Sequence, residues 1–324
     1  MKIKNILIAN HQLKFVGGSE TFTYTLIEAL KNKGYSVEYF TFFKGITSDK
    51  IEQNLSVNFM SKKRYDLILA NHYTCVRYLS RKGPIIQTCH GIFPKLEKPS
   101  PYADGFVSIS EEIKSHIFKK GFKSVLILNG INCTRYNIKT SINRELKNVL
   151  SLSQSTVANA KIESVCKEIG VNFKKLNKHI NPIWNVEDLI NEADLVVGLG
   201  RSAYEAMACG RPVVIYDERD YNSSKADGYM TTDLISKCVA NNCSGRYFNY
   251  KFSKTELIES FQSYNPVDGD SMRNYALTYF NIDKTIEQYL EYAKTLKKRN
   301  SKWRLTIVYL YQSYRIYRQR KRES

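Results

Sequence analysis

Residues 198–217, GLGRSAYEAMACGRPVVIYD, place several residue types that bind charged groups in one short segment. Apolar runs at 194–199 and 213–216 predict two buried strands, and the Ala-rich stretch between them predicts a short helix. Gly198 and Gly200 close the first strand, where glycine lets the chain turn sharply and lets a ligand approach the backbone. The segment therefore predicts a strand–turn–helix–strand unit with a ligand site at the turn.

Three side chains at the start of that helix indicate which ligand it suits. Arg201 and Ser202 would lie in the first turn, where unpaired N–H groups and the positive end of the helix dipole favour a phosphate. Glu205 follows one turn later, and its carboxylate can accept two hydrogen bonds from a ribose diol. This layout fits a nucleoside diphosphate. The alternative interpretation is that Glu205 only complements the dipole or caps the turn.

Two motifs in the first half of the chain also follow predicted strands. Gly17 and Gly18 come after an apolar run, and Ser19 can cap the helix that begins there. The loop is not G-x-G-x-x-G, so a nicotinamide cofactor is less favoured. His90, in TCHG (88–91), ends another predicted strand and is either a site residue or a structural histidine.

Strand and helix patterns alternate along almost the whole chain, which predicts parallel sheets with helices on both faces. We expect two doubly wound sheets that face a cleft, with ligands at the carboxyl ends of the strands. Strands are predicted at 4–9, 36–42, 65–70, 84–89, 105–109, 123–128, 148–152, 171–176, 194–199 and 213–216. Helices are predicted at 19–32, 111–119, 156–169, 186–191 and 282–296, the last with Ile282, Ile286, Tyr289 and Tyr292/Ala293 on one face.

The expected domain division follows from where the pattern stops and restarts. It comprises an N-terminal Rossmann-like, acceptor-side domain (1–135), a polar linker (136–147), a C-terminal Rossmann-like, nucleotide-sugar-binding domain (148–275), a helix returning to the N-terminal domain (276–296), and a basic aromatic tail (297–324).

The charge of the chain is large and uneven. The net charge is +18 over 324 residues, and the segment 297–324 holds ten Lys/Arg and one Glu, a net +9. With Trp303 and four tyrosines, this segment predicts a basic amphipathic helix that binds an anionic membrane surface. It could instead be a solvated tail, or a helix that packs its aromatic stripe on the core.

Cysteine usage and the N-terminus indicate the compartment. The seven cysteines form no C-x-x-C pair and mostly lie in apolar runs, as expected of core residues in a reducing compartment. The opening apolar stretch is too short for a signal peptide, and no run is long enough to span a bilayer. We expect a cytoplasmic protein that is peripheral on the inner face of the cell membrane.

Taken together, these motifs resemble GT-B glycosyltransferases, close to glycosyltransferase family 4. The resemblance rests on ADLVVGLGRSAYEAMACGRPVVIYD (193–217), GGSETFTYTLIEALKNKGYSVEYFT (17–41), TCHG, and SISEEIKSHIFKKGFKSVLILNGIN (108–132). Glu205 matches the second glutamate of the family motif, which holds the donor ribose. Val197 stands where the family has its first glutamate, a contact of the donor sugar, so this chain departs from the family pattern at that contact.

The resemblance implies a nucleotide-sugar-dependent hexosyltransferase acting on a hydroxyl of a glycan or lipid-linked acceptor. It places His90 and Arg201 at the reacting centre, and Gly17, Gly18, Gly200, Arg201, Ser202 and Glu205 around the donor. The family neutralises the pyrophosphate with an Arg and a Lys after the first strand of the second domain, and here Lys161 and Arg201 are the candidates. Transfer is expected to be retaining and to need no metal or other cofactor. The family and the tail together suggest synthesis of a bacterial surface polysaccharide such as lipopolysaccharide or capsule.

One acidic motif suggests a metal and is interpreted otherwise. Asp268-Gly269-Asp270 resembles a metal-binding D-x-D, but it falls in a predicted polar loop (265–271) and not at a strand end, so Asp270 is expected to be a helix N-cap.

Three other functions compete with glycosyl transfer. A nucleotide-sugar epimerase shares the expected fold but needs additional carboxylates and histidines in the cleft, of which the sequence shows few. A catalytically degenerate scaffold or partner subunit is the non-enzymatic alternative, and Val197 favours it. A nucleic-acid binder is disfavoured, because no recognised module is present and the charge is concentrated in the tail.

Overall fold

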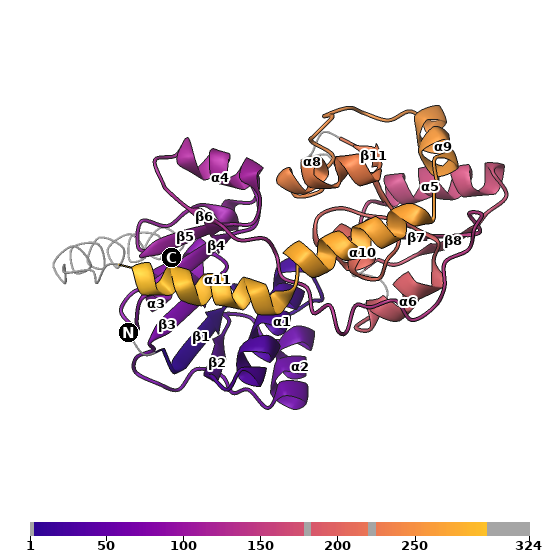
Figure 1. Cartoon of the computed structure of the whole chain (residues 1–324). Helices are drawn as coiled ribbons and strands as arrows, with labels where there is room; N and C mark the ends of the chain where they lie inside the picture. The colour runs from indigo at the N-terminus through magenta and orange to yellow at the C-terminus, as the bar shows by residue number, and fades with distance from the viewer. Residues whose placement is uncertain (1–2, 178–182, 220–224, 297–324) are drawn as a thin grey trace, which may run out of the picture.

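The computed structural model describes residues 3–177, 183–219 and 225–296, which form two lobes, each built on a sheet (Figure 1). The N-terminal lobe has a six-stranded parallel sheet in the order β2-β1-β3-β4-β5-β6. Central strands are buried on both faces, which is why they appear in the sequence as continuous apolar runs. The strands are β1 (Asn5–Ala9), β2 (Ser36–Phe40), β3 (Leu67–Ala70), β4 (Ile85–Cys89), β5 (Gly105–Ser108) and β6 (Val125–Leu126).

Helices cover both faces of this sheet and form a separate apolar cluster on each. One cluster joins the sheet to α1 (Gly18–Asn32) and α2 (Ile46–Leu55), and the other joins it to α3 (Tyr73–Leu79) and α4 (Glu111–Phe118). A short 3-10 helix, η1 (Lys95–Glu97), follows β4. The predicted doubly wound arrangement is confirmed, although α2 and α3 were not predicted.

The C-terminal lobe has a five-stranded sheet in the order β11-β10-β9-β7-β8. Its first four strands in the chain are parallel: β7 (Asn148–Ser151), β8 (Asn172–Lys175), β9 (Leu195–Val197) and β10 (Val213–Ile215). The sequence predicted these four, but it missed the antiparallel edge strand β11 (Gly228–Tyr229). The helices of this lobe are α5 (Thr156–Glu168), α6 (Val186–Glu192), α7 (Arg201–Ala208), α8 (Ile235–Ala240), α9 (Lys254–Gln262) and α10 (Val267–Tyr279), with a 3-10 turn η3 (Thr232–Leu234) before α8.

Two consecutive helices pack on different lobes. Helix α10 packs on α7, and after Asn281 the chain continues as α11 (Ile282–Thr295), which packs on α1 (Figure 1). The predicted buried face of α11 is confirmed, and the hydroxyl of its Tyr289 lies 2.8 Å from that of Thr88 on β4.

The prediction of a polar loop at 265–271 is wrong. Helix α10 begins at Val267 after Pro266, so Asp270 is not an N-cap but lies in the first helical turn. Asp268 is buried there and accepts hydrogen bonds from the hydroxyls of Tyr229 and Thr232, 3.0 and 2.7 Å away. The start of α10 was predicted as a loop because the buried side of this helix is only weakly apolar, so no helical pattern is visible in the sequence.

All seven cysteines are buried and unpaired, as predicted for core residues. Within the described ranges, no helix is long and apolar enough to cross a bilayer. The predicted basic amphipathic helix lies at 297–324, outside the described residues.

Candidate functional site

A cavity of about 260 Å³ lies where the carboxyl ends of the two sheets meet. The N-terminal lobe contributes the segment after β1, and the C-terminal lobe contributes the segments after β7, β8, β9 and β10. Such a position between two parallel sheets is where a doubly wound fold places its ligands. Lining residues include Val16, Gly17, Gly18 and Thr21 from one lobe, and Ser153, Gln154, Trp184, Arg201, Ser202, Glu205, Asp217 and Arg219 from the other.

The amino ends of α1, α5 and α7 lie at this cavity, and α6 also begins there, at Val186. Gly17 is the N-cap of α1, Ser153 and Gln154 immediately precede the N-cap of α5, and Ser202 is in the first turn of α7. The first N–H groups of a helix have no intrahelical partner, and the dipole adds partial positive charge. The two lobes therefore present a polar, electropositive wall from both sides.

The turn before α7 requires glycine. Gly200, the N-cap, has φ +56°, a backbone conformation that favours glycine, and its N–H donates to the carbonyl of Cys243 at 3.0 Å. A Cβ on Gly198 would lie 3.1 Å from that of Ser202, so this glycine is needed for close packing. Gly200 itself is adjacent to the cavity and does not line it, whereas the predicted residues Gly17, Gly18 and Ser202 do.

Arg201 makes contacts that the sequence did not predict. Its Nε donates to Glu205 Oε1 at 2.9 Å, its Nη1 to the carbonyl of Gly130 at 3.0 Å, and its Nη2 to Thr25 Oγ1 at 3.1 Å. The guanidinium is buried, and it joins α7 to α1 and to the segment after β6. Arg201 therefore connects the two lobes by hydrogen bonds and also lines the cavity.

Glu205 is the buried carboxylate of the cavity wall. Its side chain has only 9% of its surface exposed, and it forms an i,i+4 ion pair with Arg201. Burial raises the pKa of Glu205, and the charges of Arg201 and Arg135 oppose that rise. Tyr136 lines the same wall, and its hydroxyl also acts to lower the pKa of Glu205.

Lys161 and His90 do not line the cavity. The Lys161 ammonium pairs with Glu218 and lies 6.0 Å from the centre of the Tyr216 ring. His90 lies deeper in the N-terminal lobe, at the end of β4.

Among the lining residues that sequence reasoning missed, Arg219 and Trp184 carry side chains that a nucleotide could use. Arg219 follows β10 and forms an ion pair with Asp217, which also accepts from Ser153 Oγ at 2.7 Å. Trp184 packs its ring against Tyr24 at 4.7 Å and has the Arg135 guanidinium 5.5 Å from its centre. Trp184 is one of only two tryptophans in the chain and lies just before a predicted helix, which was the available signal for a site residue. Its contacts could not be predicted, because its partners are distant in sequence.

His90 is held in one tautomer. Its Nε2 lies 3.2 Å from Asn71 Oδ1, and the Asn71 amide donates to Thr23 Oγ1, so the Asn71 oxygen must accept from His90. Burial, opposed by Glu97 and reinforced by His72 and Arg201, lowers the pKa of His90 to about 4. The imidazole is therefore neutral at pH 7, with Nδ1 as its acceptor.

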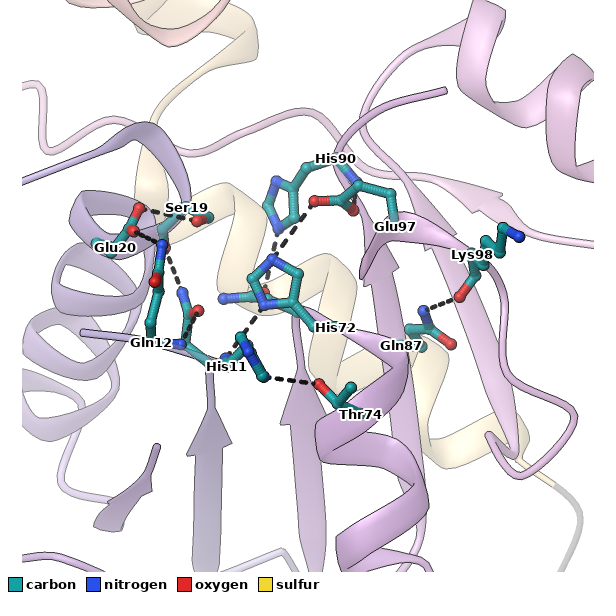
Figure 2. A network of polar contacts seen from close by, with 12 residues as sticks. His11, Gln12, Ser19, Glu20, His72, Thr74, Gln87, His90, Glu97 and Lys98 are labelled. Carbon is teal, nitrogen blue, oxygen red and sulfur yellow. Dashed lines mark hydrogen bonds and ion pairs between the residues drawn. The ribbon is translucent and has the colours of Figure 1, made fainter. Parts of the chain in front are cut away.

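Two more histidines and Glu97 continue this polar cluster across the ends of β1, β3 and β4. Glu97 accepts from the backbone N–H of His90 at 2.7 Å and lies 3.5 Å from His72 Nε2. His72 Nδ1 accepts from the backbone N–H of His11 at 3.2 Å, and His11 Nδ1 lies 3.0 Å from Thr74 Oγ1 (Figure 2). Three of the five histidines thus gather on one side of the cleft.

A second carboxylate lies at the amino end of α1. Glu20 is buried and accepts from Ser19 Oγ at 2.9 Å, and a Cβ on Gly17 would lie 2.5 Å from its Oε2. None of these clustered histidines and carboxylates of the N-terminal lobe is among the described lining residues of the cavity, whose carboxylates are Glu205 and Asp217. The residues concerned are scattered between positions 11 and 97, and only the parallel sheet brings their strand ends together.

The solved structures that resemble this chain share its two-lobed architecture. HepE of Anabaena, in complex with UDP-glucose, has 16% identity and a TM-score of 0.60, covering 90% of this chain and 100% of that one. AviGT4, a glycosyltransferase involved in avilamycin A biosynthesis, has 13% identity and a TM-score of 0.57, with 90% and 98% covered. This chain has the GT-B fold.

The same fold supports more than one reaction. The UDP-GlcNAc 2-epimerase of Neisseria meningitidis, bound to UDP-GlcNAc, has 11% identity and a TM-score of 0.52, covering 89% of this chain and 98% of that one. No protein-family model matches the chain, and no curated protein sequence does. At these identities the likeness shows the fold, and the function has to be argued from the site.

Proposed function

We propose that this protein is a glycosyltransferase that moves a sugar from a nucleotide-diphosphate-sugar to a hydroxyl of a glycan or lipid-linked acceptor. The cavity at the meeting point of the two sheets carries this proposal, since helix amino ends from both lobes flank it and the carboxylate of Glu205 lies on its wall. Solved proteins of the same fold were crystallised in complex with UDP-glucose and with UDP-GlcNAc, which supports this ligand class.

Each part of the donor has a matching group. The diphosphate would lie on the amino ends of α1 and α7, with Arg201 and Arg219 as the nearby cations. The ribose diol would bind Glu205, and Trp184 offers an aromatic face for the base. Lys161 is given no role here, because its ammonium is paired with Glu218 outside the cavity.

We further propose a front-face, retaining transfer without a metal ion. The acceptor oxygen bonds to the anomeric carbon as the bond to the β-phosphate breaks, and the leaving phosphate takes the acceptor proton. Helix amino ends stabilise the negative charge that develops on the leaving group. The anomeric configuration of the isolated product tests this step, and an inverted product rules it out.

The remaining parts of the proposal concern location and pathway. The basic aromatic segment 297–324 would hold the enzyme on the inner face of an anionic membrane. There it would take part in the synthesis of a bacterial surface polysaccharide such as lipopolysaccharide or capsule.

Turnover of a donor panel tests the activity. The full chain is incubated with UDP-, GDP- and CDP-sugars, each with and without a mixture of glycan acceptors, and released nucleotide is measured. We expect release with one nucleotide class, and Glu205→Gln should lower it. No release from any donor, with the chain folded, would favour a scaffold or partner subunit.

A nucleotide-sugar epimerase is the second candidate. The observation that favours it is the polar cluster of the N-terminal lobe, which lies outside the cavity wall and comprises His11, His72, His90, Glu20 and Glu97. Such groups can take a proton from one face of a sugar carbon and return a proton to the opposite face of the same carbon. The same donor panel followed by NMR without acceptor separates the two reactions. An isomerised sugar still attached to its nucleotide would establish epimerisation in place of transfer.

A further inference from the structure

Several aromatic rings are exposed together at the carboxyl ends of β1–β3. Phe42, Phe43 and Tyr78 have 41%, 53% and 57% of their surface exposed. Ring centres of Phe42 and Phe43 each lie 5.4 Å from that of His11, and Phe42 lies 5.5 Å from Tyr78. These four residues form one contiguous surface, which we call the aromatic patch.

The backbone beneath the aromatic patch is firmly held. The N–H of Phe42 donates to the carbonyl of His11 at 3.1 Å, and the N–H of Leu13 donates to the carbonyl of Phe43 at 2.8 Å. Thr41 Oγ1 also donates to the His11 carbonyl, at 3.2 Å. The segments after β1 and β2 thus extend the sheet, and the rings are presented on fixed positions.

Core packing does not account for these rings. Phe40 is buried and fills the apolar cluster below, with its ring stacked on Tyr78 at 4.9 Å. Phe42 and Phe43 follow beyond the end of β2 and leave about half of their surface in solvent. A contiguous exposed apolar surface on a folded chain indicates a binding site.

A short stretch of chain joins the aromatic patch to the cavity. Residues 11–17 run from His11 of the patch to Gly17 of the cavity wall. Beneath them, the polar cluster of Figure 2 connects His11 through His72 and Glu97 to His90, whose pKa is sensitive to the charge of Arg201. The loop after β1 therefore contributes both to the patch, through His11, and to the cavity wall, through Gly17.

The polar groups of the patch suit hydroxyls better than anions. Burial and the neighbouring His72 lower the pKa of His11, so this imidazole is neutral at pH 7. Lys44 nearby is paired with Glu52 at 2.7 Å, and the Lys14 ammonium lies over the Phe15 ring at 5.4 Å. Flat apolar rings beside a neutral imidazole match the alternating C–H faces and hydroxyls of sugar rings.

We propose that the aromatic patch of His11, Phe42, Phe43 and Tyr78 binds the sugar rings of a carbohydrate acceptor and leads its reacting hydroxyl into the cavity. This inference rests on the proposed transferase function and names its acceptor class. The neutral His11 and the ion-paired Lys44 favour sugar rings over an anionic lipid headgroup as the occupant of the patch.

An array of defined oligosaccharides probed with the full chain tests the proposal. The double variant Phe43→Ala/Tyr78→Ala removes two rings that are mostly exposed, and Tyr279→Ala on α10, 54% exposed, is the matched control. We expect the wild-type chain to bind a subset of the array, the double variant to lose roughly tenfold or more in affinity, and the control to bind as the wild type does. Titration with UDP-glucose should be the same for all three proteins.

Three results would overturn the proposal: no binding to any oligosaccharide, equal binding by the double variant, or an equal loss in the Tyr279→Ala control. A fourth is binding of phosphatidylglycerol vesicles that the double variant alone loses, since the patch would then contact lipid. If oligosaccharides bind through the patch but no nucleotide-sugar binds or turns over, the transferase function fails and the carbohydrate surface stands.

Discussion

Replacement of Glu205 by glutamine tests the part of the site on which the donor assignment depends. The amide keeps the shape of the side chain and an oxygen at Oε1 that can still accept from Arg201 Nε. What it removes is the negative charge, so two charge-assisted bonds to a ribose diol become neutral ones. Neutral bonds are weaker by about 1–1.5 kcal/mol each, which gives about 2–3 kcal/mol, or about 30- to 150-fold in Kd.

The same change also weakens the fold by a smaller amount. Arg201 keeps its bonds to the Gly130 carbonyl and to Thr25, so the buried guanidinium is not left without acceptors. We expect a loss of about 1–2 kcal/mol in the free energy of unfolding. Glu38→Gln is the matched control, because Glu38 is equally buried and hydrogen-bonded to Ser61 but lies on β2 away from the cavity.

Calorimetric titration with UDP-glucose at several pH values gives the decisive readout. Burial raises the pKa of Glu205 above its usual 4.5, so donor affinity of the wild-type chain should fall as the pH drops through that raised pKa. The glutamine variant should bind weakly with no such pH dependence. Unchanged affinity in the variant, or an equal loss in Glu38→Gln, would refute the placement of the ribose on Glu205.

Three further outcomes are expected. The pKa of His90 is about 4 in the folded chain against 6.5 unfolded, so between these pH values the unfolded chain binds more protons; the free energy of unfolding should fall by on the order of 3 kcal/mol from pH 7 to pH 4, and denaturant titrations of His90→Gln should lack that part of the decline. Gly200→Ala, at φ +56°, should cost about 1–3 kcal/mol of stability and also weaken UDP-glucose binding, whereas Gly121→Ala, at φ +83° with open space around it, should lose only stability. Removal of 297–324 should abolish salt-sensitive binding to anionic liposomes, and equal binding by the shortened chain would contradict the membrane assignment.

The strands were predictable because burial on both faces leaves a direct trace in the sequence. Runs such as LILA in β3 and VVI in β10 cannot be solvent-exposed helices, and their alternation with helices fixed the parallel sheets. Helix α2, ITSDKIEQNL, was missed because it buries only one narrow side and is otherwise polar. The two-residue strand β11 is too short for any pattern to appear.

The cavity glycines were predictable, but the partners of its charged groups were not. Glycine requirements are local, since φ at Gly200 is set by the turn itself. By contrast, Arg201 contacts Thr25 across 176 positions of sequence, and His90 contacts Asn71 from the neighbouring strand end. Such pairings depend on the order of the strands and on how the two lobes pack. The sequence predicted parallel sheets but not the order of their strands.

The Arg201–Glu205 pair reconciles the expected role of these residues with their observed contacts. In the structure each neutralises the other inside the cavity wall, where a lone buried charge would be costly. In the proposed complex, the ribose hydroxyls would donate hydrogen bonds to Glu205, and the diphosphate would accept hydrogen bonds from Arg201. Both charged side chains would then keep a partner even if they moved apart. Since Arg201 also holds Gly130 and Thr25, any movement of its guanidinium toward the diphosphate is transmitted to α1 and to the segment after β6. The proposed mode of donor binding would therefore couple the donor to the relative position of the two lobes through one side chain, Arg201.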